Sequence, residues 1–223
     1  MSVGWKPTEV VMIRTAVGVP PALAQRHNRV LRPKDAAHVY AHPRAELARL
    51  VRIGAAVRLA TGYVALTPQG RLGDTTWRPE LNAAALGIAQ ADYGRDATAL
   101  MGVSAARHHG AIPRALAVAV VAVPKQRPVL RGEIGAVIFS RRDCSRLDLE
   151  RIDTELGSGW ITTIEQTLLD LAVRPDQGGL PILEVDQALR SLALRGDPVL
   201  LAELAAVQHR PAALRRIREL LED

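Results

Sequence analysis

Residues 43–66 read PRAELARLVRIGAAVRLATGYVAL, which combines helix-like apolar spacing with two β-prone runs. In its first half, apolar residues recur at spacings of three and four, at Leu47, Leu50 and Val51. This spacing predicts one buried face of a helix, because side chains three and four apart lie on the same side. We therefore expect a helix over Pro43–Ile53, ended by the glycine that follows it.

The second half of this stretch is typical of a small hairpin. Two β-prone runs flank Ala60-Thr61-Gly62 within residues 56–66. Upstream, a proline in the first turn predicts two further helices, over Pro21–Val30 and Pro33–Tyr40. Three helices followed by a hairpin form the element order of a winged helix-turn-helix. We expect this fold in residues 1–72.

Positive charge is concentrated in the same segment. Residues 1–72 contain 11 Lys and Arg against three Asp and Glu, a net charge of +8, whereas the remainder contains 18 against 20, a net charge of −2. A basic block of this kind is typical of a surface that binds a polyanion such as DNA. A merely solvated basic surface is the plainer alternative.

A DNA-recognition helix buries one face and offers hydrogen-bond donors on another. Three arginines of the expected helix lie off its apolar positions, and arginine's planar fork meets phosphate or guanine bidentately. The hairpin adds an arginine and a threonine that can contact the DNA backbone or the minor groove. A lysine near the start of the preceding helix can contact a DNA phosphate where that helix crosses the backbone. The candidate DNA-contacting residues are Lys34, Arg44, Arg49, Arg52, Arg58 and Thr61.

The N-terminal apolar stretch lacks the pattern of a targeting signal. Residues 1–19 fit an opening helix or a strand, but Arg14 interrupts the apolar run and Pro20-Pro21 ends it. No small-residue cleavage site follows and no run is long enough to cross a bilayer, so we expect neither a signal peptide nor membrane association. The single cysteine, Cys144, excludes an internal disulfide and favours a reducing compartment, the cytoplasm.

The rest of the chain predicts a second domain. Residues 67–80 are rich in proline and glycine, which indicates a linker that few contacts cross, so that residues 1–72 and 78–223 fold independently. Together they make an α+β protein, a winged helix-turn-helix plus a mixed α/β C-terminal domain ending in a helical bundle. The expected helices are Leu81–Ala91, Asp96–His108, Thr162–Ala172, Pro181–Arg195, Pro198–Val207 and Pro211–Leu221, and the expected strands are Leu116–Val123 and Ala136–Ser140.

Two helix starts carry local signals. Thr162 and Glu165 have the spacing of a capping box, in which each side chain bonds the other residue's backbone N–H. Asp197-Pro198 is a good pair for a cap followed by a first turn. His108-His109 suits a helix C-terminus better than a metal site, because adjacent helical side chains diverge by about 100°.

Three stretches in order resemble the AbiEi antitoxin family. Residues 46–66 resemble the sequence pattern of the family's winged helix and read ELARLVRxGxxVRLxxGYVAL. Ser104–Gly110 resembles its SALxxHG segment, and Thr162–Leu171 resembles its TSPxRTLxDL segment, with Gln166 where many relatives have arginine. The resemblance covers about Leu31 to Ala172. The residues it singles out in the second domain are Ser104, His108, His109, Thr163, Glu165, Thr167 and Asp170.

The resemblance implies an antitoxin with two activities. It implies repression of its own operon through the N-terminal domain, with double-stranded operator DNA as partner. Separately from the resemblance, we expect at most weak self-association on that DNA. It also implies a cognate nucleotidyltransferase-like toxin, neutralised through the C-terminal domain directly or indirectly. The alternative is a winged-helix repressor that responds to a small ligand. A small-molecule pocket beside the strand Leu116–Val123 would favour this alternative.

The sequence offers no motif for an enzyme, a cofactor or a metal. None of the three lysines, Lys6, Lys34 and Lys125, follows an acid two places earlier, so the acid-x-Lys core of restriction-like nucleases is absent. No P-loop and no Gly-x-Ser-x-Gly elbow occurs. His38 and His42 are four apart, but no third metal ligand is evident. We therefore expect neither catalysis nor a cofactor.

Overall fold

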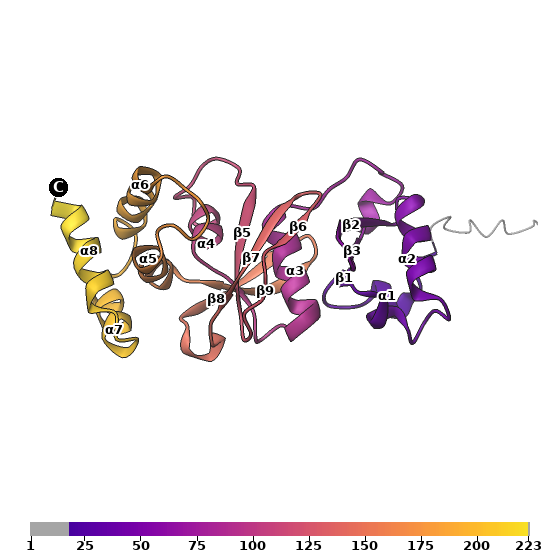
Figure 1. Cartoon of the computed structure of the whole chain (residues 1–223), viewed down its shortest axis with the longest axis horizontal. Helices are drawn as coiled ribbons and strands as arrows, with labels where there is room; N and C mark the ends of the chain where they lie inside the picture. Colours follow the sequence, from indigo (N-terminus) through magenta and orange to yellow (C-terminus); the bar gives the residue numbers. More distant parts are fainter. Residues whose placement is uncertain (1–17, 223) are drawn as a thin grey trace, which may run out of the picture.

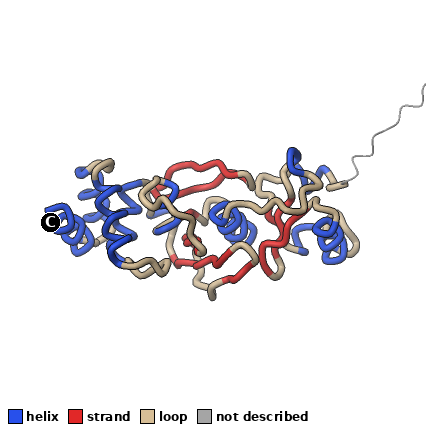
Figure 2. Tube along the Cα trace, turned by 90° about the horizontal axis from the view of Figure 1, so that it is seen from above, coloured by secondary structure: helices blue, strands red, loops and turns tan. Residues whose placement is uncertain are grey.

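The computed structural model describes residues 18–222, which form three parts in succession along an elongated molecule (Figure 1). A small N-terminal module comes first, a six-stranded sheet with helix α3 (Leu81–Tyr93) lies in the middle, and a group of helices forms the other end. Seen from above, the strands of the central sheet lie between the N-terminal module and these helices (Figure 2). The chain is a mixed α+β protein, as the sequence predicts.

The N-terminal module packs one main helix against a three-stranded antiparallel sheet in the order β1-β3-β2. Leu47 and Leu50, on one face of that helix, are buried against Leu31, Val64 and Leu66. The helix expected over residues 43–53 and the hairpin expected within residues 56–66 are both confirmed. The elements are α1 (Pro21–Ala24), β1 (Val30–Leu31), the 3-10 helix η1 (Pro33–Ala36), α2 (Pro43–Arg52), β2 (Ala56–Ala60), β3 (Tyr63–Leu66) and the 3-10 helix η2 (Gln69–Arg71).

The helices expected over Pro21–Val30 and Pro33–Tyr40 are wrong in extent. The first ends at Ala24, because Val30 and Leu31 pair with β3 as a third strand. The second is only a 3-10 turn, since the Asp35 carboxylate folds back onto the backbone and side chain of Arg32. The opening element expected in residues 1–19 falls almost wholly outside the described residues.

The central sheet is mixed, in the order β6-β7-β5-β4-β9-β8. The pairs β7/β5 and β4/β9 are parallel and the other neighbours are antiparallel. The strands expected from the two apolar runs are confirmed as β5 and β7. The elements after α3 are β4 (Ala99–Leu100), α4 (Val103–His108), β5 (Val118–Val123), β6 (Leu130–Gly132), β7 (Gly135–Arg141), the 3-10 helix η3 (Cys144–Arg146), β8 (Leu149–Thr154) and β9 (Gly157–Thr162).

Strand β5 divides two hydrophobic cores. Val121 and Val123 face one core with α3, whereas Val120 and Ala122 face the other core with α4 and the C-terminal helices. Successive strand residues point to opposite faces, so a strand covered on both sides must be apolar throughout. This explains the continuous valine-rich run of β5.

The helix expected over Asp96–His108 is wrong in its first part. Residues Ala99–Leu100 instead form β4, which pairs with β5 on one side and β9 on the other. Gly102 follows with a positive φ of 56°, which separates the strand from α4 and favours glycine. A two-residue strand is too short to show a period of its own.

The C-terminal end consists of α5 (Ile164–Val173), α6 (Ile182–Ala193), α7 (Pro198–Val207) and α8 (Pro211–Glu222), in agreement with the expected helices. The Asp197 carboxylate caps α7 by accepting from the backbone N–H groups of Val199 and Leu200, as predicted. The capping box of Thr162 and Glu165 is wrong by one residue. Thr163 is the N-cap of α5, and Glu165 instead accepts from the backbone N–H of Asp197 at 2.7 Å.

The expectation that few contacts cross between the two halves is wrong. One hydrophobic core contains Val30, Val57 and Tyr63 of the N-terminal module together with residues of α3 and the central sheet. A Cβ atom at Gly87 of α3 would collide with Val30, and one at Gly132 of β6 would collide with the carbonyl oxygen of Leu59. The module therefore packs closely against both α3 and β6, and it shares a core with α3.

Candidate nucleic-acid interface

A groove of about 600 Å³ opens between η1, α2 and the β2–β3 hairpin. It brings together four of the six predicted DNA-contacting residues, Lys34, Arg44, Arg58 and Thr61, although they come from three separate elements. Its remaining lining residues are Arg32, Pro33, Leu47, Ala48, Val51, Ala60, Gly62, Tyr63 and Val64. The floor is thus apolar and its rim is basic.

The positive charges of the rim are available to a ligand. Among the ion pairs formed by residues 18–222, none involves Lys34, Arg44 or Arg58. All three side chains are exposed. Unpaired arginine forks and a lysine ammonium at one rim offer charge-assisted hydrogen bonds to phosphate oxygens.

Helix α2 presents a stripe of arginine and alanine side chains outward. Arg44, Ala48 and Arg52 follow one another at four-residue spacing, and Ala45 beside them is also exposed. Only Arg44 and Ala48 of this stripe line the groove, and Arg52 continues the stripe beyond it. Exposed alanines let the backbone of a helix approach a partner closely. In α2 the arginines at the two ends of the stripe, Arg44 and Arg52, flank these alanines.

Arg49 lies apart from the groove. Its Nε donates to Glu46 Oε2 at 2.8 Å within the same helix, so its charge is partly satisfied. The sequence grouped Arg49 with Arg44 and Arg52 because all three avoid the apolar positions. The structure separates it because the 100° step per residue places it on the flank of α2.

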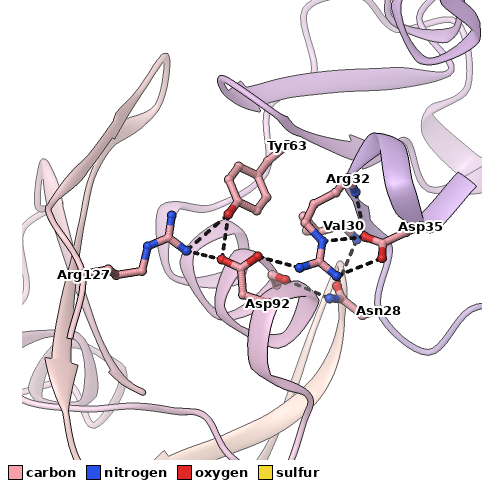
Figure 3. Close-up of polar contacts among 8 residues, drawn as sticks. Asn28, Val30, Arg32, Asp35, Tyr63, Asp92 and Arg127 are labelled. Carbon is pink, nitrogen blue, oxygen red and sulfur yellow. Dashed lines mark hydrogen bonds and ion pairs between the residues drawn. The ribbon is translucent and has the colours of Figure 1, made fainter. Parts of the chain in front are cut away.

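Asp92, at the C-terminal end of α3, holds two residues that line the groove (Figure 3). Its Oδ1 accepts from Arg32 Nη1 at 2.7 Å, and its Oδ2 accepts from Tyr63 Oη at 2.7 Å. Arg127, from the loop after β5, donates to the same Oδ2 and lies with its guanidinium 4.2 Å from the centre of the Phe139 ring. One carboxylate thus connects the groove, α3 and the central sheet.

Arg32 is shared between two carboxylates. Hydrogen bonds with Asp35 and Asp92 raise the pKa of Arg32, against a lowering by burial. Burial raises the pKa of Asp35, but the bonds from Arg32 outweigh it and the net pKa is lowered. Arg32 therefore stays charged and paired, and it serves as a fixed wall of the groove rather than as a free cation.

Sequence reasoning missed Arg32, Tyr63, Asp92 and Arg127 as parts of this site. Their only sequence signal is charge type, because 60 residues separate Arg32 from Asp92 and 35 separate Asp92 from Arg127. Asp92 directly follows the helix predicted over Leu81–Ala91, where an acidic side chain is usually solvated. Its role follows from the packing of the module on α3, which no local pattern encodes.

The residues singled out in the second half hold elements together. Ser104 Oγ accepts from the Val120 backbone N–H at 2.8 Å, and the two hydroxyls of Thr162 and Thr167 lie 2.8 Å apart. The His109 ring, almost fully buried, bonds the Thr162 carbonyl at 2.8 Å through Nε2. The two stretches Ser104–Gly110 and Thr162–Leu171 therefore meet at one junction. His108, in contrast, is exposed.

The remaining polar residues of α5 anchor the helical end. Thr163 Oγ1 donates to Asp148 Oδ2 at 2.7 Å. Asp170, whose side chain is 3% exposed, accepts from Arg142 Nη2 at 2.6 Å and from Gln166 Nε2 at 3.3 Å. Gln166 is itself fully buried and pairs with Gln208.

Within residues 18–222, no group of three or more His, Cys, Asp or Glu side chains is placed to hold a metal ion. No helix in this part of the chain combines the length and apolar character that a membrane span requires.

Comparison with known proteins bears on the second half of the chain. Residues 97–223, more than half of the sequence, match the family model described as the AbiEi antitoxin C-terminal domain. The match begins just before β4 and covers both stretches that meet at the His109–Thr162 junction. No curated protein sequence matches the chain significantly.

Proposed function

The chain belongs to the AbiEi antitoxin family, and from this premise we propose that it represses its own operon and restrains a nucleotidyltransferase-like toxin. The family makes the chain the antitoxin of a toxin–antitoxin pair. Its DNA-binding part is the N-terminal module, which acts as a winged helix-turn-helix. Its toxin-directed part is the C-terminal half that matches the family model.

The basic groove is the observation that carries the DNA-binding proposal. Its rim has three cations, Lys34, Arg44 and Arg58, from η1, α2 and the hairpin, which form no ion pair with any other described residue. In a winged helix-turn-helix the second helix enters the major groove and the wing contacts the backbone beside it. With α2 in the recognition role, Arg44 near its N-terminus faces base edges, and Lys34 and Arg58 meet phosphates on either side.

The other predicted residues take secondary roles in this proposal. Thr61, at the tip of the hairpin, donates to a phosphate or reaches the minor groove. Arg52 contacts the DNA backbone at the far end of the α2 stripe. Arg49, which bonds Glu46, supplies general positive potential rather than a direct contact.

The toxin-directed activity is supported by the surface of the helical end. Large apolar side chains are exposed there, with Leu183 72%, Leu194 82% and Val207 72% exposed. Arg215 and Arg218 are exposed on α8, a helix of the same end of the molecule, whereas Arg216 is engaged by Asp186 at 2.8 Å. Apolar side chains next to free arginines are frequent in surfaces that bind proteins.

The ligand-responsive alternative finds no support at the place expected for it. The residues of β5 from Ala119 to Val123 are fully buried and pack into the two cores on its two faces. Side chains thus fill the space between β5 and the helices that cover it.

The two activities are tested together in cells that carry a reporter under the operon's promoter and an inducible cognate toxin. Arg44→Ala combined with Arg58→Ala in the full chain should release the reporter and still protect against the toxin. Arg131→Ala, an exposed arginine of β6 outside the groove, should behave as wild type in both assays. Loss of protection in the double variant at normal protein abundance would show that protection works through DNA, and the two-activity proposal would be wrong.

A further inference from the structure

A second basic cavity, of about 270 Å³, lies at the other end of the molecule, away from the N-terminal groove. It opens between the segment that follows β7 and the turn that connects α7 with α8. Four guanidinium groups line it, those of Arg141, Arg142, Arg146 and Arg210. We call it the arginine pocket.

The arginine pocket keeps a net positive charge, because its four arginines face two acids, Asp143 in the lining and Asp170 at Arg142. Arg142 is paired with Asp170, but Arg141, Arg146 and Arg210 take part in none of the ion pairs formed by the described residues. The acid in its lining, Asp143, is engaged by the backbone N–H and hydroxyl of Ser145. Burial and the nearby charge of Arg142 lower the pKa of Arg210, so these cations repel one another.

The walls of the pocket are fixed by buried polar contacts. Asp170 Oδ1 accepts a hydrogen bond from Arg142 Nη2 at 2.6 Å. The other carboxylate oxygen, Oδ2, is buried and has no hydrogen-bond partner among the described residues. Gln208 of the lining donates to the buried Gln166 at 2.5 Å. His209 has a positive φ of 54°, which turns the chain so that Arg210 follows into the pocket wall. A left-handed residue other than glycine is held there by surrounding structure.

These features point to one kind of ligand. Arginine forks bind phosphate oxygens bidentately, and several forks around one cavity match a group with many oxygens. At about 270 Å³, the cavity is slightly smaller than the roughly 300–1,000 Å³ typical of small-molecule sites, so it suits a small ligand. A phosphate chain meets these conditions better than the carboxylates of a protein partner, which are borne singly on separate side chains.

We propose that the arginine pocket binds a small phosphate-bearing ligand, with Arg142 as the oriented anchor and Arg146 and Arg210 as further contacts. Inorganic polyphosphate and the phosphate chain of a nucleotide share this chemistry. The pocket is separate from the DNA-binding groove, so its occupancy does not depend on the function proposed above.

Calorimetric titration of the full chain at near-physiological salt tests this assignment, with inorganic triphosphate and a nucleoside triphosphate as separate probes. Arg146→Gln combined with Arg210→Gln should weaken triphosphate binding about tenfold or more, because two charge-assisted contacts are lost. Arg215→Gln combined with Arg218→Gln removes an equal number of positive charges from the exposed side of α8. This control variant should bind triphosphate as wild type does. Arg146→Gln alone, at an exposed position with little risk to folding, should give a smaller loss in the same direction.

The two probes separate the sources of the ligand. Equal affinity for both probes means that the phosphate chain alone is recognised, whereas tighter binding of the nucleotide means that its base or sugar adds contacts. The proposal fails if wild type binds neither probe, or if both double variants lose affinity equally. It also fails if triphosphate binding is weakened only by Arg44→Ala combined with Arg58→Ala, in the other groove. A third contrary outcome is that no probe binds and the pocket variant loses protection against the toxin. The pocket would then be a protein-docking site.

Discussion

Arg32 donates a hydrogen bond to Asp92 at 2.7 Å, and this contact ties a wall of the basic groove to the helix on which the N-terminal module rests. The same carboxylate accepts from Tyr63 of the groove and from Arg127 of the central sheet's loop. The groove is therefore held in close packing against α3.

Asp92→Asn should lower the free energy of unfolding by about 2–4 kcal/mol. The substitution leaves Arg32 and Arg127, both largely buried, without their shared negative partner, and breaking such a pair is costly. Urea unfolding measures the effect, with the exposed Asp153→Asn as a control expected within about 0.5 kcal/mol of wild type. Equal stability of the two variants would mean that the Asp92 contacts contribute nothing.

Gly132→Ala should destabilise the chain by about 1–3 kcal/mol through overpacking. A Cβ atom there would collide with the Leu59 carbonyl oxygen, which also accepts from the Glu133 N–H at 3.2 Å. Thermal unfolding should show one transition at a lower temperature, because the module and the sheet share a core. Gly70→Ala, at a site open to solvent, is the matched control and should leave the transition in place. Two separate transitions in wild type would contradict the shared core.

Local pattern was enough for part of this fold. The helix α2 and the β2–β3 hairpin follow from apolar spacing and turn residues within residues 43–66, and the valine-rich run identifies β5. The third strand β1 and the two-residue β4 were missed because each is defined by partners far along the chain, Ala65 for Val30 and Trp160 for Ala99. The shared core was missed because Gly87 and Gly132 carry no signal of what packs on them.

The two adjacent histidines should differ sharply in their contribution to stability. His109→Ala removes a buried ring and leaves the Thr162 carbonyl without the donor that lies 2.8 Å away, which should cost about 1–3 kcal/mol. His108→Ala, one residue earlier and exposed, should change the free energy of unfolding by about 0.5 kcal/mol or less. Chemical denaturation of the two variants compares them directly. A larger loss for His108→Ala would assign the junction to the wrong histidine.

Asp170 should make stability fall as pH rises. Burial raises the pKa of Asp170 to about 6 in the folded chain, from an ordinary value of 3.8, although the charge of Arg142 acts to lower it. Between these pH values the folded chain binds more protons than the unfolded chain, so the free energy of unfolding declines toward neutral pH.

Comparison with Asp170→Asn isolates this contribution, since other carboxyl groups titrate equally in both proteins. From pH 4 to pH 7 wild type should lose about 2–3 kcal/mol relative to the variant. Asp176→Asn, an exposed position after α5, should keep the wild-type pH profile. If wild type instead gains stability over Asp170→Asn with rising pH, the carboxylate is stabilised by Arg142 more than burial destabilises it.

If the basic groove binds DNA, the affinity of the full chain for its operator depends steeply on salt. With five or six phosphate contacts, affinity should fall roughly a thousandfold between 50 and 200 mM salt. Arg44→Ala should cost about 1–3 kcal/mol at the operator, and Arg58→Ala should weaken all sequences evenly and reduce the salt slope by about one. Arg215→Ala combined with Arg218→Ala should bind as wild type. A flat salt response, or groove variants that bind like this control, would contradict the assignment of the groove as the DNA-binding surface.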